Sequence, residues 1–90
     1  MRSRLPNSEE RGAQPKYLWL YEELARKIAS GVFKPGDRLP SEPQIAEEYG
    51  IAYMTVRRAV SALVESGHLY RVRGRGTFVA EPEASDRRPA

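Results

Sequence analysis

The order of capping and turn residues between Arg38 and Val79 constrains the fold of this chain more than any other feature. Ser41-Glu42-Pro43-Gln44 has the S-x-x-Q form of a capping box, in which the serine accepts a hydrogen bond from a first-turn N–H and the glutamine reaches back to the cap. Pro43 is tolerated there because first-turn N–H groups lack intrahelical partners. The pattern predicts a short helix after Ser41 that ends at Gly50, a residue suited to a left-handed C-terminal position.

A second helix is predicted from about Tyr53 to Ser66, with Gly67 ending it. At the helical period, four apolar residues cluster on one side of this helix: Val56, Ala59, Val60 and Leu63. Polar and flexible residues fall on the flanks and the opposite side, among them Met54, Arg57, Arg58 and Ser61. Gly50-Ile51-Ala52 forms the turn between the two helices, so the pair predicts a helix-turn-helix.

Two short β-prone runs, Leu69–Val72 and Thr77–Ala80, flank Arg73-Gly74-Arg75-Gly76 and predict a hairpin. Period-two alternation places Tyr70 and Val72 on one face of the first strand, and Thr77 and Val79 on one face of its partner. The glycines permit positive φ and a close approach of the backbone to another surface. The strand aromatics, Tyr70 and Phe78, are expected in the core rather than on a platform for bases.

An earlier helix is predicted from about Tyr17 to Gly31, because apolar residues recur at i, i+3, i+4 and i+7. This stripe consists of Tyr17, Leu20, Tyr21, Leu24, Ala25 and Ile28. Trp19 lies off the stripe, so it either covers a neighbouring element or serves a partner surface. Lys34-Pro35-Gly36-Asp37 is a turn signal that leads into a short extended piece at Arg38-Leu39.

The expected fold is mainly α with a small β-hairpin. It is a winged helix-turn-helix of three helices and a two- to three-stranded antiparallel sheet, and it spans residues 16–80. The polar segments 1–15 and 81–90, which contain proline and mixed charges, are expected to be disordered tails.

The distribution of charge indicates one surface that faces a polyanion. The formal net charge is only +3. Between Arg57 and Arg75, however, there are five arginines against one acid, Glu65. Residues 17–37 instead balance three bases against three acids. A locally basic segment in a nearly balanced chain is typical of a nucleic-acid-binding face.

Composition excludes several classes of protein. The absence of cysteine excludes a disulfide scaffold and a Cys-based zinc site. No apolar run approaches membrane-spanning length and no signal-peptide core is present, so we expect a cytoplasmic protein that acts at the nucleoid. The one histidine, His68, follows a helix C-terminus, which is typical of a structural role. With no nucleophile–base pair and no phosphate-cradling loop before a helix, neither an enzyme, a cofactor nor a metal is expected.

These motifs resemble a known family. Pro35-Gly36-Asp37-x-Leu39-Pro40-Ser41-Glu42, Thr55-Val56-Arg57-Arg58-Ala59, Leu63 and Gly74-x-Gly76-Thr77-Phe78-Val79 look like the DNA-binding domain of GntR-type bacterial transcription regulators. The aromatic-rich first helix and the closing Gly-Thr-Phe-Val are most similar to the HutC branch. The resemblance implies that helix 53–66 enters the major groove and that wing 73–76 reaches the adjacent minor groove.

The resemblance also implies roles for individual residues. Arg57 matches a position that contacts bases or phosphates, Thr55 matches a phosphate contact, and Arg73, Gly74 and Arg75 match the wing. We therefore expect contacts to double-stranded DNA from Arg38, Ser41, Gln44, Tyr53, Met54, Thr55, Arg57, Arg58, Arg73, Gly74, Arg75 and Gly76. The expected function is a sequence-specific transcription repressor that pairs on an inverted-repeat operator.

The chain departs from the family pattern at the reading positions. Pro43 stands where a basic residue usually follows Ser-Glu, and Ala52-Tyr53-Met54 replaces a Ser-Arg-Thr-like triplet. Alanine is a poor N-cap residue, so Ala52 lowers the stability of the helix by about 1 kcal/mol relative to serine. An aromatic ring and a thioether suit thymine methyl groups better than guanine. We expect an operator that differs from the common ones of the family.

The length of the chain is compatible with two kinds of protein. Family members usually carry a C-terminal effector-binding and dimerisation domain, and the ten residues after Ala80 cannot form one. The chain is either an excised DNA-binding domain or a small regulator without the sensor. Two rival functions stay open: a winged-helix module that binds protein through Trp19 and the first helix, and a nonspecific binder of RNA or other nucleic acid.

Overall fold

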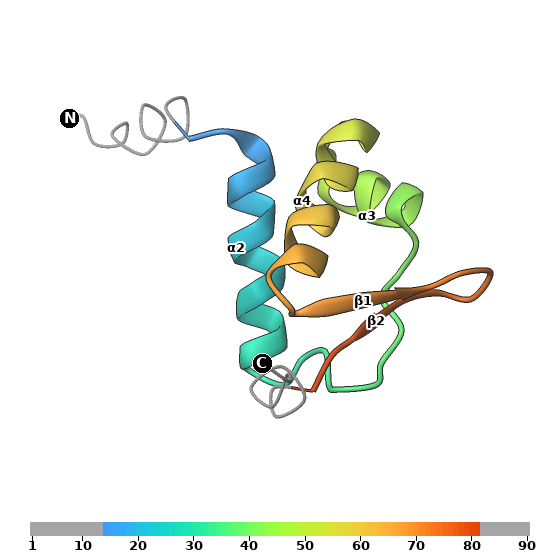
Figure 1. Cartoon of the computed structure of the whole chain (residues 1–90). Helices are drawn as coiled ribbons and strands as arrows, with labels where there is room; N and C mark the ends of the chain where they lie inside the picture. Colours follow the sequence, from blue (N-terminus) through green and yellow to red (C-terminus); the bar gives the residue numbers. More distant parts are fainter. Residues whose placement is uncertain (1–13, 82–90) are drawn as a thin grey trace.

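The computed structural model describes residues 14–81 as three helices followed by a hairpin (Figure 1). The elements are α2 (Lys16–Ala29), α3 (Glu42–Tyr49), α4 (Tyr53–Glu65), β1 (Leu69–Val72) and β2 (Gly76–Val79). The expected fold class, a mainly α winged helix-turn-helix, is confirmed. The expected tails lie outside the described residues, apart from Gln14, Pro15 and Glu81.

Helix α2 forms because its apolar stripe faces the rest of the domain. Leu20 and Leu24 are fully buried, while the other stripe residues pack around them. Pro15 is the N-cap, and its carbonyl accepts hydrogen bonds from the first-turn N–H groups of Leu18 and Trp19. Trp19 contacts Tyr49 of α3 edge to face, with ring centroids 6.1 Å apart, so it partly covers a neighbouring element.

Helix α3 begins and ends as its caps predict. Ser41 Oγ accepts a hydrogen bond from the N–H of Gln44 at 3.2 Å, and Gln44 Oε1 accepts one from the N–H of Ser41 at 2.8 Å. Both halves of the capping box are therefore present. Gly50 ends the helix in the left-handed region, at φ 66° and ψ 38°. The turn that follows directs the chain into α4.

Helix α4 buries one face and exposes the other. The side chain of its N-cap residue, Ala52, makes no capping hydrogen bond. The backbone carbonyl of Ala52 accepts hydrogen bonds from the N–H groups of Thr55 and Val56. The expected apolar face is confirmed, because Val56, Ala59, Val60 and Leu63 are all buried. In Figure 1, α4 lies between α2 and α3, and the hairpin projects beyond the helices.

The hairpin pairs β1 and β2 in antiparallel register, with Leu69 opposite Val79 and Tyr70 opposite Phe78. The second strand begins one residue earlier than expected, at Gly76, because Gly76 pairs with Val72. The expectation that Tyr70 and Phe78 lie in the core is wrong. The register buries Leu69 and Val79 instead, and the two aromatics stack on the opposite face, where Tyr70 is 44% exposed.

A third extended segment pairs with the far edge of β2. Arg38 forms an isolated antiparallel bridge with Phe78. The N–H of Leu39 donates to the carbonyl of Thr77, and the N–H of Val79 donates to the carbonyl of Asp37. Strand β2 therefore lies between β1 and this segment. The sheet has two full strands and one isolated bridge, in agreement with the expected two to three strands. This pairing ties the base of the hairpin to the segment that enters α3.

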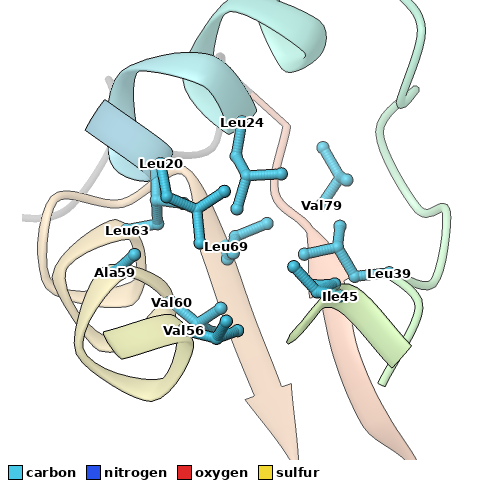
Figure 2. Close-up of a cluster of buried hydrophobic side chains, with 10 residues drawn as sticks. All are labelled: Leu20, Leu24, Leu39, Ile45, Val56, Ala59, Val60, Leu63, Leu69 and Val79. Atoms are coloured by element: carbon cyan, nitrogen blue, oxygen red, sulfur yellow. The ribbon is translucent and has the colours of Figure 1, made fainter. Parts of the chain in front are cut away.

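The core collects apolar side chains from every element (Figure 2). It contains Leu20, Leu24, Leu39, Ile45, Val56, Ala59, Val60, Leu63, Leu69 and Val79. No polar or charged side chain within residues 14–81 is buried. Four partly buried aromatic side chains pack against this core: Tyr17, Tyr21, Phe33 and Tyr49. The Tyr49 hydroxyl accepts a hydrogen bond from Lys27, and this bond raises the pKa of Lys27. The core fixes α4 against its neighbours and leaves its polar face outside.

Candidate nucleic-acid interface

The outward face of α4 carries the residues that the sequence marks as reading positions. Met54 is 66% exposed and Tyr53 is 44% exposed. Thr55 is half-buried on the side of the helix toward α2, while Arg57 and Arg58 are exposed. Because the opposite face is fully buried in the core, these side chains are the ones that α4 presents to a ligand.

The two arginines of this helix diverge to different neighbours. The Arg58 guanidinium lies over the Tyr17 ring of α2, with Cζ 4.0 Å from the ring centroid. Arg57 turns the other way, toward α3, where its Nε lies 3.8 Å from Oε1 of Glu42. Each guanidinium is thereby held at a flank of α4, by a cation–π contact on one side and an ion pair on the other.

A shallow groove of about 690 Å³ runs between the N-terminal turn of α2 and the outward face of α4. It is lined by Pro15, Lys16, Tyr17, Met54, Thr55, Arg57, Arg58 and Ser61. Three of these side chains are cationic and none is acidic. A groove with this lining suits an extended anion such as a nucleic-acid backbone.

Contacts of Arg71 join the hairpin to both helices of the helix-turn-helix. The Nη2 atom of Arg71, in β1, lies 3.3 Å from Oε2 of Glu42. The same nitrogen donates a hydrogen bond to Ser61 Oγ at 3.3 Å. The carboxylate of Glu42 therefore contacts guanidiniums from α4 and from β1. This cluster places Arg71 beside the outward face of α4 rather than at the hairpin tip.

The hairpin tip presents cations on a tight turn. Arg73, Gly74 and Arg75 are exposed, and the N–H of Arg75 donates to the carbonyl of Val72 at 2.8 Å. Gly74 has φ 78° and open space where a Cβ would lie. At Gly76, a Cβ would lie 2.9 Å from Nε of Arg38, so this glycine makes room for the Arg38 side chain.

Ser41 is the N-cap of α3 and Gln44 lies in its first turn, and both residues are exposed. In the capping box each side-chain oxygen accepts one backbone hydrogen bond, so the Ser41 hydroxyl hydrogen and the Gln44 side-chain NH₂ remain able to donate outward. Arg38 is also exposed, on the hairpin side of this turn.

Five of the expected residues, Tyr53, Met54, Thr55, Arg57 and Arg58, lie in the first half of α4. Ser41 and Gln44 lie at the start of α3, Arg38 lies beside β2, and residues 73–76 lie at the hairpin turn. The contacts and the groove lining add five residues that were not among the expected DNA contacts. The additions are Lys16, Tyr17, Glu42, Ser61 and Arg71. Arg71 belongs to the basic segment, yet charge alone does not separate it from its neighbours. Its partner Glu42 is 29 residues away, so only the tertiary packing places the two together.

Neither a metal-binding cluster nor a membrane-spanning helix is found among the described residues. Within residues 14–81, no group of three or more His, Cys, Asp or Glu side chains is placed to hold a metal ion. None of the helices in that range has the length and apolar character needed to cross a membrane. His68 hydrogen-bonds through Nδ1 to Ser66 Oγ at 2.8 Å and packs edge-on against Tyr21.

Curated relatives of this chain are regulators. The transcriptional repressor NagR of Bacillus subtilis is 46% identical over 86% of the chain, which covers 32% of that repressor. The histidine utilization repressor of Klebsiella aerogenes is 44% identical over 77% of the chain and 29% of its own length. The chain thus spans about a third of the length of these relatives. Similarity to a histidine utilization repressor agrees with the expected resemblance to the HutC branch.

Solved structures agree with the sequence relatives. The DNA-binding domain of AraR in complex with operator ORR3 is 39% identical, with a TM-score of 0.70 over 73% of the chain and 80% of that domain. A GntR family transcriptional regulator from Listeria monocytogenes is 28% identical, with a TM-score of 0.75 over 80% of the chain and 63% of that protein. Residues 16–79 match the bacterial regulatory proteins of the gntR family. The chain belongs to the GntR family of transcription regulators.

Proposed function

We propose that this chain binds operator DNA sequence-specifically and represses transcription by occupying it. The observation that carries the proposal is the outward face of α4, where Met54 is exposed between two arginines held at opposite flanks. A helix of this kind fits the major groove, where side chains reach base edges. Relatives named as repressors, and the AraR domain solved with its operator, support the same function.

We assign different roles to the two flanks of α4. Arg57 contacts a base edge, because its guanidinium lies beside the outward face and half of its side chain is exposed. Arg58 and Thr55 line the groove toward α2 and contact phosphates. Lys16, which lines the same groove, contacts phosphates with them. Tyr53 and Met54 pack on apolar base edges such as thymine methyl groups.

The remaining expected contacts surround this helix. Ser41 at the N-cap of α3 and Gln44 in its first turn donate to the DNA backbone. Arg38 supports the wing from its base. Arg73, Gly74, Arg75 and Gly76 form the wing, whose arginines enter an adjacent minor groove. In a bacterial cell this DNA lies in the nucleoid, in the cytoplasm.

Selection of bound sequences from random duplex DNA tests the proposal directly. We expect an enriched inverted repeat, because paired recognition helices require related half-sites. The enriched duplex should then bind more tightly than a scrambled duplex of equal length in fluorescence anisotropy. Failure to enrich any sequence, with equal binding of all duplexes, would contradict sequence-specific repression.

A second candidate function is binding of single-stranded nucleic acid. The outer face of the hairpin favours it, because the exposed ring of Tyr70 stacks there on the half-buried ring of Phe78, with ring centroids 5.8 Å apart. Solvent-facing strand aromatics are typical of base-stacking platforms. Competition separates the two functions: single strands should fail to displace the selected duplex if α4 is the reading element, and should displace it if the hairpin face binds bases.

A further inference from the structure

We propose that Glu42 is a positioning residue for DNA reading: it orients Arg57 toward a base and holds Arg71 as an additional phosphate contact. The inference rests on the proposed function and deepens it. Glu42 lies in the first turn of α3, and its side chain is 20% exposed. It stands where α3, α4 and β1 meet, so one carboxylate reaches the charged side chains of two other elements.

Each oxygen of this carboxylate contacts a different guanidinium. Oε1 lies 3.8 Å from Nε of Arg57, and Oε2 lies 3.3 Å from Nη2 of Arg71. The contact to Arg57 is through Nε, and neither terminal nitrogen of Arg57 makes an ion pair or hydrogen bond within residues 14–81. Those two nitrogens form the fork that binds O6 and N7 of guanine. Glu42 thus restricts the Arg57 side chain without consuming the atoms that read a base.

Arg71 is held by two elements at once. Its Nη2 contacts Glu42 and also donates to Ser61 Oγ, one turn along the outward face of α4 from Arg57. The Arg71 side chain is 43% exposed, so it remains accessible to a ligand. Two guanidiniums against one carboxylate leave this cluster with a net positive charge. The cluster can therefore attract a phosphate beside the major-groove helix, separately from the hairpin tip.

An acidic residue at this position also has an ordinary structural role, because negative charge in the first turn of a helix is favourable. The two roles predict different results. A structural residue acts on folding and hence on all DNA alike. A positioning residue acts on discrimination between sequences, and its removal takes a negative charge away from the DNA-facing surface.

The test compares Glu42→Gln with Glu47→Gln. Both variants remove one negative charge from α3, but Glu47 is exposed and its side chain makes no ion pair or hydrogen bond within residues 14–81. Anisotropy gives the dissociation constants for the selected duplex and for the same duplex with the base pair read by Arg57 exchanged. Their ratio measures discrimination, and a random duplex measures nonspecific affinity.

We expect Glu42→Gln to lower the discrimination ratio about tenfold, within the range for a bidentate base contact. Binding of the random duplex should stay as tight as in Glu47→Gln, because the hydrogen bond to Ser61 still holds Arg71 near the DNA backbone. In the Arg57→Ala background, Glu42→Gln should lower the ratio no further, because the effect passes through Arg57. Arg71→Ala should weaken the selected and the random duplex by the same factor and reduce the salt slope by about one.

Three outcomes would overturn the inference. A discrimination ratio equal to that of Glu47→Gln would remove the positioning role. Equal loss on all duplexes together with a lower melting temperature would assign Glu42 to folding alone. Unchanged affinity in Arg71→Ala would remove the phosphate contact. If the wild-type chain itself selects no sequence, the proposed function fails first, and that result is separate from these three.

Discussion

At the scale of single residues, adjacent arginines on α4 have different surroundings and hence different expected roles. Arg57 pairs with Glu42 on the α3 side, while Arg58 stacks on Tyr17 over the groove beside α2. We therefore expect Arg57 to read sequence and Arg58 to contact the DNA backbone. Sequence alone presents them as a pair of like charges.

Arg57→Ala should lower affinity for the selected duplex by about 1–3 kcal/mol and relax the preference at one base position, because a bidentate contact to guanine is lost. Repeating the selection with the variant measures both effects. Arg58→Ala is the matched control, since it removes the same charge one residue away and should weaken all sequences alike. An equal loss on every sequence for Arg57→Ala would make it a phosphate contact.

At the scale of elements, the hairpin should act separately from α4. Arg75→Ala should lower affinity and weaken any preference for A·T pairs beside the major-groove site, because narrow A·T-rich minor grooves concentrate negative potential. The bases selected by α4 should stay the same. Comparison of selection profiles for the variant and the wild type measures this, and two identical profiles with identical affinities would remove the wing from the interface.

Gly74→Val examines the same element without changing charge. Gly74 adopts φ 78°, and a Cβ there meets nothing within the domain. The cost in the free protein is therefore backbone strain, on the order of 1–3 kcal/mol, rather than a clash. We expect weaker DNA binding from the distorted turn and from bulk at the groove. Wild-type affinity for this variant would mean that only the charge of the tip matters.

Elements with local signals could be predicted from the sequence. The capping box at Ser41 and Gln44 and the left-handed Gly50 define α3 through contacts within a few residues. The face on which Tyr70 lies could not be predicted, because alternation groups residues by face without showing which face the helices cover. The Glu42–Arg71 contact joins α3 to β1, so no spacing in the sequence reveals it.

At the scale of the whole molecule, DNA affinity should depend steeply on salt. Cations from α2, α4 and the hairpin surround the reading face, so each protomer should neutralise roughly five phosphates. The slope of log affinity against log salt should then approach about −4 to −5. Anisotropy titrations over a salt series measure it. A flat response would contradict the nucleic-acid interface and favour a protein partner.

The isolated chain should be monomeric and should pair only on DNA. Within residues 14–81 the large exposed apolar side chains, which are Trp19, Val32, Tyr53, Met54 and Tyr70, are distributed over several elements. They do not supply the continuous apolar area of a permanent interface. Sedimentation should show one copy free and two on the selected inverted repeat. A tight dimer without DNA would redirect attention to Trp19 and α2.

The central position of β2 has a consequence for solubility. With β1 on one side of β2 and Arg38 on the other, β1 has no strand partner along its outer edge within residues 14–81. Open strand edges invite pairing with other chains, and natural proteins discourage it with short strands and charge. Strand β1 is four residues long and carries Arg71, with Arg73 just beyond it. We therefore expect Arg71 and Arg73, which we assign to DNA, also to protect this edge from aggregation, so that replacing both with neutral residues should make the chain aggregate more readily.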